Sequence, residues 1–211
     1  MKIVQSNARL RAQINKALAK EGEKVLATAA SRIQSRVREI VRIAIASCPE
    51  ISSLSSGTLR LDFGLEEDPS SQIVNAIVGS VKVDVTKIRA TAGRLSGGIT
   101  INVQPSDFSN LLSLSIAQQP VRGGSIPWLS WLLTAGDSII IADFGVEYSS
   151  GSGRTGGARM SQDFAPFKVD PKFSGNSQDN FITRAITPKF REISSIIRKE
   201  LSKWLAVLTQ D

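Results

Sequence analysis

Apolar residues in the first part of the chain recur with the period of a helix. Residues 5–46 contain no proline, and the apolar positions return at helical spacing: Leu10, Ile14, Leu18, Ile33, Val37, Ile40, Val41 and Ala44. The pattern predicts one long helix, or two helices broken near Gly22, because a glycine inside a helix costs about 1 kcal/mol relative to alanine. An unbroken helix would extend roughly 60 Å, so we expect part of it to project from the domain or to pack on a neighbouring subunit.

A period of two follows the Cys48-Pro49 pair, where the helix should end because the residue before a proline avoids the α region. Apolar and polar residues alternate in four segments: 59–65, 81–85, 99–103 and 112–116. Such alternation is typical of half-buried antiparallel strands. The polar stretch 86–98 is longer than the usual hairpin connection of about two to five residues, and we expect a long loop there.

The remaining segments complete an α+β pattern. "IPWLSWLL" predicts a short helix at 126–135, with Pro127 in its first turn and Gly136 after its end. A strand is expected at 138–148. In the last segment, Thr187-Pro188 begins an amphipathic helix that carries Trp204 on its apolar stripe.

We therefore expect a single α+β domain spanning 1–211. Its parts are a basic N-terminal helical region, a β-sheet region built as an antiparallel meander with long loops, an irregular Gly/Pro-rich segment, and a C-terminal amphipathic helix packed on the sheet. The boundaries are 1–47 for the helical region, 57–148 for the sheet region, 149–187 for the irregular segment and 188–209 for the last helix.

Charge is concentrated near the N-terminus. Residues 1–47 contain ten basic residues against three acidic ones, a net +7 that equals the charge of the whole chain. Lysine and arginine on one helix neutralise phosphates without reading sequence, so this helix could face nucleic acid or another polyanion; the alternative is a solvated helical face. The candidate residues for contact with a polyanion, or for facing the lumen if subunits form a ring, are Arg32, Arg36, Arg38 and Arg42.

The composition argues against most enzyme classes. The chain has no histidine and one cysteine, Cys48, which removes the commonest general base and any multi-cysteine zinc site. No aliphatic run approaches the roughly 20 residues that span a bilayer. We expect a soluble protein that is not an enzyme and needs no cofactor or metal. The acidic run Glu66, Glu67 and Asp68 is interpreted as a solvated turn rather than a metal or catalytic cluster.

The stretch "YSSGSGRTGGARM" has Gly151, Gly153 and Gly156 in the order G-x-G-x-x-G after a predicted strand. A dinucleotide site also needs a helix directly afterwards, to offer free N–H groups to the pyrophosphate, and the following residues lack helical spacing. We interpret the stretch as a flexible or interface-forming loop. Two tryptophans lie three residues apart, which suits core packing or an interface anchor. The candidate subunit or partner interface is Trp128, Trp131, Arg94, Arg154 and Arg159.

Several strings resemble a known family. "PEISSLSSGTLRLDFGL" follows the long N-terminal helix, and "PFKVDPKFSGNSQDNFITRAI" precedes "FREISSIIRKEL" near the C-terminus. In this order they resemble the neck or tail-completion proteins of long-tailed bacteriophages, a class of head-tail joining proteins. "IPWLSWLLTAGDSIII" and "SGRTGGARM" are similar to strings in virion structural proteins of contractile-tailed phages.

The resemblance implies a homo-oligomeric ring, usually sixfold, with no catalysis. Such a ring joins the DNA-filled head to the tail in a neck, tail-completion or tail-terminator role. The implied partners are the portal or adaptor, other neck proteins and the tail tube or tail terminator, with non-specific contact to DNA in the lumen and none to a membrane. The implied location is the virion, after assembly in the host cytoplasm. The alternative is a basic nucleic-acid-binding module that acts through the N-terminal helix.

Overall fold

The computed structural model describes residues 7–91, 94–121, 124–162 and 165–208, and the side chains of 8–90, 94–121, 124–162 and 165–203. The contacts between residues divide the chain into two units. Unit 1 combines Met1–Arg38, Val81–Asn102 and Arg191–Asp211, and unit 2 combines Glu39–Ser80 and Val103–Phe190. The single domain predicted from the sequence stays a prediction.

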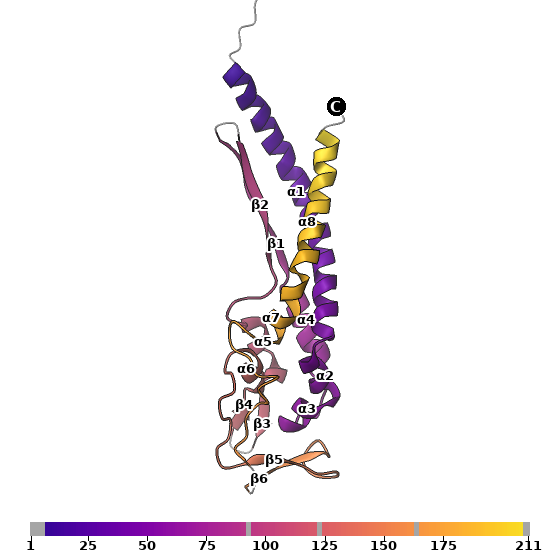
Figure 1. Ribbon diagram of the computed structural model, residues 1–211, viewed down its shortest axis with the longest axis vertical. Coiled ribbons are helices and arrows are strands. Elements are labelled where there is room, and N and C mark those ends of the chain that lie inside the picture. The colour runs from indigo at the N-terminus through magenta and orange to yellow at the C-terminus, as the bar shows by residue number, and fades with distance from the viewer. Residues whose placement is uncertain (1–6, 92–93, 122–123, 163–164, 209–211) are drawn as a thin grey trace, which may run out of the picture. The chain divides into compact units, whose positions relative to one another are not determined.

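Unit 1 contains most of the long helix α1 (Asn7–Ala46), which runs without a break through Gly22 (Figure 1). A glycine inside a helix costs about 1 kcal/mol relative to alanine, and the buried apolar residues elsewhere on α1 offset this cost. Leu26, Ala29, Ile33 and Val37 repeat at spacings of three and four, and all are buried. The C-terminal helix α8 (Phe190–Leu208) contributes the buried Ile193.

An antiparallel hairpin completes unit 1. Strands β1 (Lys82–Thr91) and β2 (Arg94–Asn102) pair with Val83 opposite Ile101 and Val85 opposite Ile99, as the alternation predicts. The ladder continues, after an irregularity between Thr86 and Arg89, to Thr91 opposite Arg94. The prediction of a long loop at 86–98 is therefore wrong. Residues 86–98 are polar because the ends of β1 and β2 nearest the turn are largely exposed to solvent.

After the end of α1, unit 2 continues with three shorter helices, and the second of them replaces the strand predicted at 59–65. They are α2 (Pro49–Ser56), α3 (Thr58–Asp62) and α4 (Ser70–Ser80). Leu59 and Phe63 lie four residues apart and are both buried, as on one face of a helical turn. A short run of alternating residues satisfies both periods, which is why the strand prediction failed. The strand predicted at 112–116 is likewise replaced, by α5 (Ser109–Leu112) and the 3₁₀ turn η1 (Ser115–Ala117).

The rest of unit 2 joins short strands and helices. The predicted helix at 126–135 is confirmed as α6 (Trp128–Leu133), but the strand predicted at 138–148 is only β5 (Gly145–Tyr148). The segment predicted as irregular contains β6 (Ala158–Ser161) and α7 (Phe181–Ile186), followed by the 3₁₀ turn η2 (Thr187–Lys189). The side chain of Asn180 caps α7 by accepting hydrogen bonds from Ile182 N and Thr183 N.

The α+β class is confirmed, with its long N-terminal and C-terminal helices. Among the described residues, the strands form three separate antiparallel pairs rather than one meander: β1–β2, β5–β6, and β3 (Gln119–Val121) with β4 (Gly124–Ile126). The C-terminal helix was expected to pack on the sheet, but its ion pairs join it to α1. The side chain of Trp204 lies outside the described residues. Within the part of the chain described above, no helix combines the length and apolar content that a membrane crossing requires.

Candidate functional site

Unit 1 gathers three sequence segments that each carry a positive net charge. Together they contain seventeen lysines and arginines against six aspartates and glutamates, a net charge of +11. Unit 2 contains nine basic residues against thirteen acidic ones, a net charge of −4. The fold therefore sharpens the asymmetry seen in the sequence, because the hairpin and the last helix add their positive charge to that of α1. A surface of this sign attracts polyanions and acidic protein surfaces.

Most cations of unit 1 are exposed and make no ion pair or side-chain hydrogen bond with any described residue. Their charge is therefore offered to solvent or to a partner, with no internal carboxylate to neutralise it. They lie on α1, on both strands of the hairpin and on α8: Arg11, Lys16, Lys20, Lys82, Lys87, Arg89, Arg94, Arg191, Arg198 and Lys199.

A buried carboxylate joins α1 to α8 inside this basic unit. Glu200 has a fully buried side chain and accepts hydrogen bonds from Lys203 Nζ at 2.8 Å and Arg32 Nε at 3.2 Å. Arg36 Nη1 lies 3.6 Å from Glu200 Oε1. The Lys203 hydrogen bond is the main cause that holds the pKa of Glu200 below its ordinary value, aided by the charges of both arginines.

The four arginines predicted to meet a polyanion thus have partners within the chain. Besides the two that bind Glu200, Arg38 Nη2 donates to the backbone oxygen of Val81 at 3.3 Å. Arg42, which belongs to unit 2, donates from Nη1 to Asn75 Oδ1 at 3.1 Å. These side chains fasten elements to α1, and the cations without internal partners lie elsewhere. The signal that could have found them is the net charge of +3 in residues 81–102.

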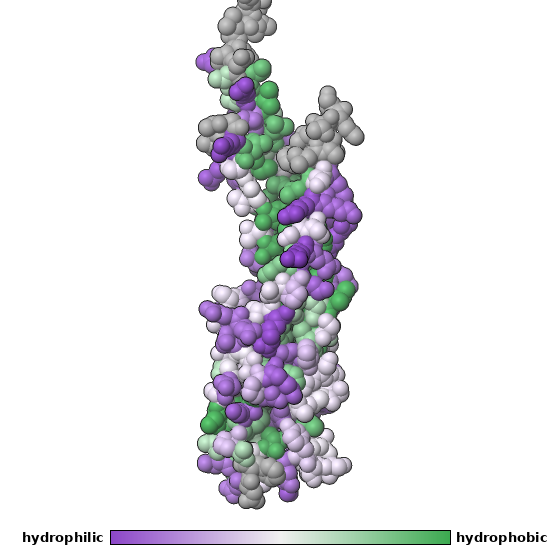
Figure 2. Space-filling view, in the orientation of Figure 1, coloured by the Kyte–Doolittle hydropathy of each residue, from purple (hydrophilic) through white to green (hydrophobic). Residues whose placement is uncertain are grey.

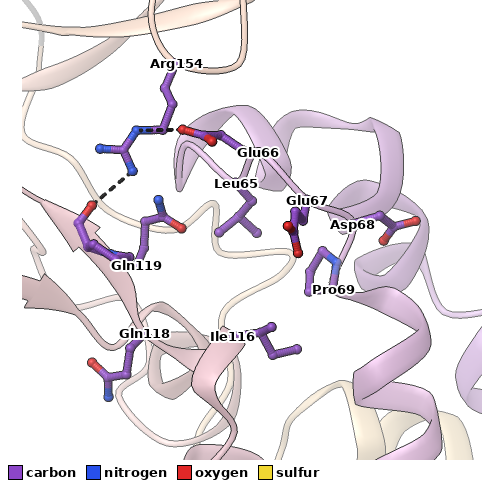
Figure 3. Close-up of a pocket in the computed structure, with 10 residues that line it drawn as sticks. Leu65, Glu66, Glu67, Asp68, Pro69, Ile116, Gln118, Gln119 and Arg154 are labelled. Atoms are coloured by element: carbon purple, nitrogen blue, oxygen red, sulfur yellow. Dashed lines mark hydrogen bonds and ion pairs between the residues drawn. The ribbon is translucent and has the colours of Figure 1, made fainter.

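Unit 2 contains an acidic pocket of about 490 Å³ (Figure 3). The predicted turn residues Glu66, Glu67 and Asp68 line it, and Arg154 reaches in from the β5–β6 connection. Arg154 Nε lies 3.4 Å from Glu66 Oε1, and its Nη1 donates to the backbone oxygen of Pro120 at 3.0 Å. Burial acts to raise the pKa of Asp68, but hydrogen bonds from Ser70 and Ser55 outweigh it and hold that pKa below its ordinary value.

An apolar groove of about 610 Å³ lies next to the acidic pocket, and Gln119 and Arg154 line both. Its floor includes Phe63 and Phe167, whose rings meet edge to face with centroids 6.0 Å apart. The other apolar residues that line it come from the strands of unit 2 and their connections: Val121, Ile126, Ile141, Phe144, Val146, Ala158 and Met160.

The glycine-rich stretch is the turn of the β5–β6 hairpin. Gly151, Gly153 and Gly156 have φ angles of +76°, +69° and +72°, in the left-handed region that favours glycine. A Cβ on Gly153 would lie 1.7 Å from the backbone oxygen of Ala158, so this position admits no side chain. Strand β6 follows, rather than a helix N-terminus. The glycines therefore serve the turn geometry, and a flexible or interface-forming role for the stretch stays a prediction.

The predicted interface residues have different surroundings. Trp128 is fully buried, contacts Phe63 and donates from Nε1 to the backbone oxygen of Ile116, so its assignment to an interface is wrong and it belongs to the core. Trp131 is half-buried and donates to Ser138 Oγ. Arg159 Nε lies 2.7 Å from Glu147 Oε2. An interface role for Trp131, Arg94, Arg154 and Arg159 stays a prediction.

The described residues contain no group of three or more cysteine, aspartate or glutamate side chains placed to hold a metal ion. Comparisons of the chain with models of protein families, with curated proteins and with solved structures found no match. The functional argument therefore depends on the charge and surface of the two units and on the short sequence strings.

Proposed function

We propose that the chain is a structural protein of the phage neck, which assembles into a homo-oligomeric ring between the DNA-filled head and the tail. The observation that carries the proposal is the division of charge, +11 in unit 1 against −4 in unit 2. A subunit with surfaces of opposite charge is suited to heterologous contacts with its neighbours, and such contacts close into rings when the rotation between copies allows it. The sixfold symmetry, the virion location and the neck, tail-completion or tail-terminator role come from the family resemblance.

The basic unit gives such a ring a surface for its acidic surroundings. Exposed cations on the hairpin and on α8, such as Lys87, Arg89, Arg198 and Lys199, have no carboxylate partner among the described residues. In a ring they would face DNA in the lumen or an acidic surface of the portal, adaptor or tail terminator. Backbone phosphates would be bound without sequence preference.

The test is to locate the protein in purified virions. We expect it there in a copy number that matches a ring, and chemical cross-linking should join it to the portal or to a tail-terminator subunit. Native mass measurement of the purified protein should show a closed oligomer, alone or after mixing with those partners. A protein that is absent from virions and strictly monomeric with every partner would contradict the proposal.

The second candidate is a nucleic-acid-binding module that acts through unit 1. The same unpaired cations favour it, because each bound phosphate adds to a salt-dependent affinity. It predicts DNA binding by the monomer at low salt. Replacing Lys87, Arg89 and Arg94 with alanine should lower the slope of log affinity against log salt by about 1 for each phosphate that the variant no longer binds.

A matched control removes three cations from unit 2 instead. Lys168, Lys172 and Arg159 are exposed, and their replacement with alanine changes the net charge by the same amount. Equal loss of DNA affinity in both triple variants would reject a site on the hairpin. Retained affinity in the hairpin variant alone would also reject it.

A further inference from the structure

We propose that copies of this chain associate head to tail, with the first turns of α1 in one copy docked in the apolar groove of unit 2 in the next. The inference rests on the self-association in the proposed ring and names the two surfaces that make it. The docking stripe is defined as Leu10 and Ile14. The groove is the cavity lined by Val121, Phe144 and Met160 together with the other residues named above.

The docking stripe is an apolar helix face without a partner among the described residues. Leu10 and Ile14 lie four residues apart, on one side of α1, and are 47% and 50% exposed. Four and eight residues further along the same face, Leu18 is half-buried and Gly22 is buried, and Leu26 follows in the core. Figure 2 shows hydrophobic residues along this part of α1. The face that builds the core of unit 1 thus continues into solvent.

The groove can accept such a face. Its volume of about 610 Å³ and its mostly apolar lining suit two aliphatic side chains one turn apart, as in helix-in-groove recognition. Val121 and Met160 are 38% and 39% exposed, so apolar surface of the groove remains in contact with water. Burying both surfaces against each other would remove this apolar area from water.

The net charge of −4 in unit 2 and the acidic pocket next to the groove favour the basic unit 1 of a second copy as the occupant. Arg11, Lys16 and Lys20 lie in the same turns of α1 as the docking stripe or in the next ones, exposed and unpaired among the described residues. The groove shares its Gln119–Arg154 wall with the acidic pocket (Figure 3), where Glu67 has no partner among the described residues either. A pairing of two docking stripes would instead bring two units of charge +11 together, which like-charge repulsion opposes.

The contact is heterologous, because each copy offers a stripe to one neighbour and a groove to another. This gives a test by complementation. The stripe variant Leu10→Glu/Ile14→Glu keeps its groove, and the groove variant Val121→Glu/Met160→Glu keeps its stripe. All four positions are exposed, so circular dichroism and thermal unfolding should show both variants folded.

We expect wild-type protein to form larger assemblies that weaken with salt, and each variant alone to remain monomeric in light scattering after gel filtration. An equimolar mixture should form a one-to-one dimer and nothing larger, since only one intact stripe and one intact groove can meet. The control variant Ile43→Glu/Ile139→Glu changes two other exposed apolar residues and should assemble like the wild type.

A mixture that stays monomeric, or a wild type that never associates, overturns the inference. Variants that assemble like the wild type also overturn it, but they leave the neck proposal standing, with other surfaces forming the ring. Loss of DNA binding by the stripe variant without any change in mass would assign the stripe to nucleic acid instead. Complementation by a protein that is absent from virions would support the contact and reject the neck.

Discussion

Glu200 accepts a hydrogen bond from Arg32 across 168 residues of sequence, and this contact fastens α8 to α1. Glu200→Gln should remove the charge that Arg32, Arg36 and Lys203 share. Because the carboxylate is buried and its cationic partners would lose their anion, we expect a loss of about 1–3 kcal/mol in the free energy of unfolding. Denaturant unfolding at neutral pH measures it. Glu39→Gln, at an exposed site on α1, is the control and should change the free energy of unfolding little.

The same residue predicts a pH dependence. The pKa of Glu200 in the folded protein is lowered from its ordinary value of 4.5, so its contribution is fully present above that value and is lost as the pH falls through the lower folded pKa. The difference in unfolding free energy between wild type and Glu200→Gln should therefore shrink in acid. Thermal unfolding of both proteins from about pH 7 to about pH 3 would show it, and a difference that stays constant would exclude the lowered pKa.

Gly153→Ala should destabilise unit 2 more than Gly151→Ala. Both glycines have positive φ, which costs about 1–2 kcal/mol for an L-residue. Only Gly153 would also place its new Cβ against the backbone oxygen of Ala158, whereas Gly151 faces open space. We expect a lower melting temperature for Gly153→Ala and a smaller decrease for Gly151→Ala. Equal melting temperatures would show that the turn yields at both positions.

Arg184 holds a buried carboxylate of unit 2. Its Nη2 lies 2.8 Å from Glu50 Oε1, and its Nη1 lies 3.2 Å from Asp179 Oδ1. Arg184→Gln leaves Glu50 charged and buried without its cation, and we expect the free energy of unfolding to fall by about 2–4 kcal/mol. This loss is smaller than for a fully buried ion pair, because Arg184 is partly exposed to solvent.

A double-mutant cycle with Glu50→Gln measures the interaction of Arg184 with Glu50. The double variant should be more stable than the sum of the two single losses predicts, since the uncompensated charge is then absent. Strict additivity would mean that the two side chains do not interact in solution.

Cys48 should resist thiol reagents in the folded protein. Burial, together with the negative charge of Glu50, raises the pKa of its thiol to about 11. At about pH 8 the reactive thiolate is then about one part in a thousand, and the rate should rise about tenfold per pH unit. Ellman's reagent with and without denaturant measures the difference. Rapid labelling of the native protein at that pH would show that the site opens.

Local patterns in the sequence were sufficient where one period extended over many residues or where a turn had distinctive chemistry. Residues 5–46 repeat at helical spacing over many turns, so α1 could be predicted, and Pro127 with Gly136 marked the ends of α6. The residues after Gly156 lack helical spacing, and the structure has strand β6 there rather than a helix. Short alternating runs such as 59–65 could not be assigned, because about five to seven residues satisfy a strand and a helical turn equally well.

The sequence by itself determined the charge excess of the N-terminal region, the absence of histidine chemistry and the two long amphipathic helices. Only the tertiary structure decided which cations are available to a partner. Arg32 and Arg36 lie next to Glu200, which comes from the other end of the chain, while Lys87 and Arg94 on the hairpin have no described partner. Charge is additive along a sequence, but its pairing depends on distances between residues that lie far apart in it, and folding sets those distances.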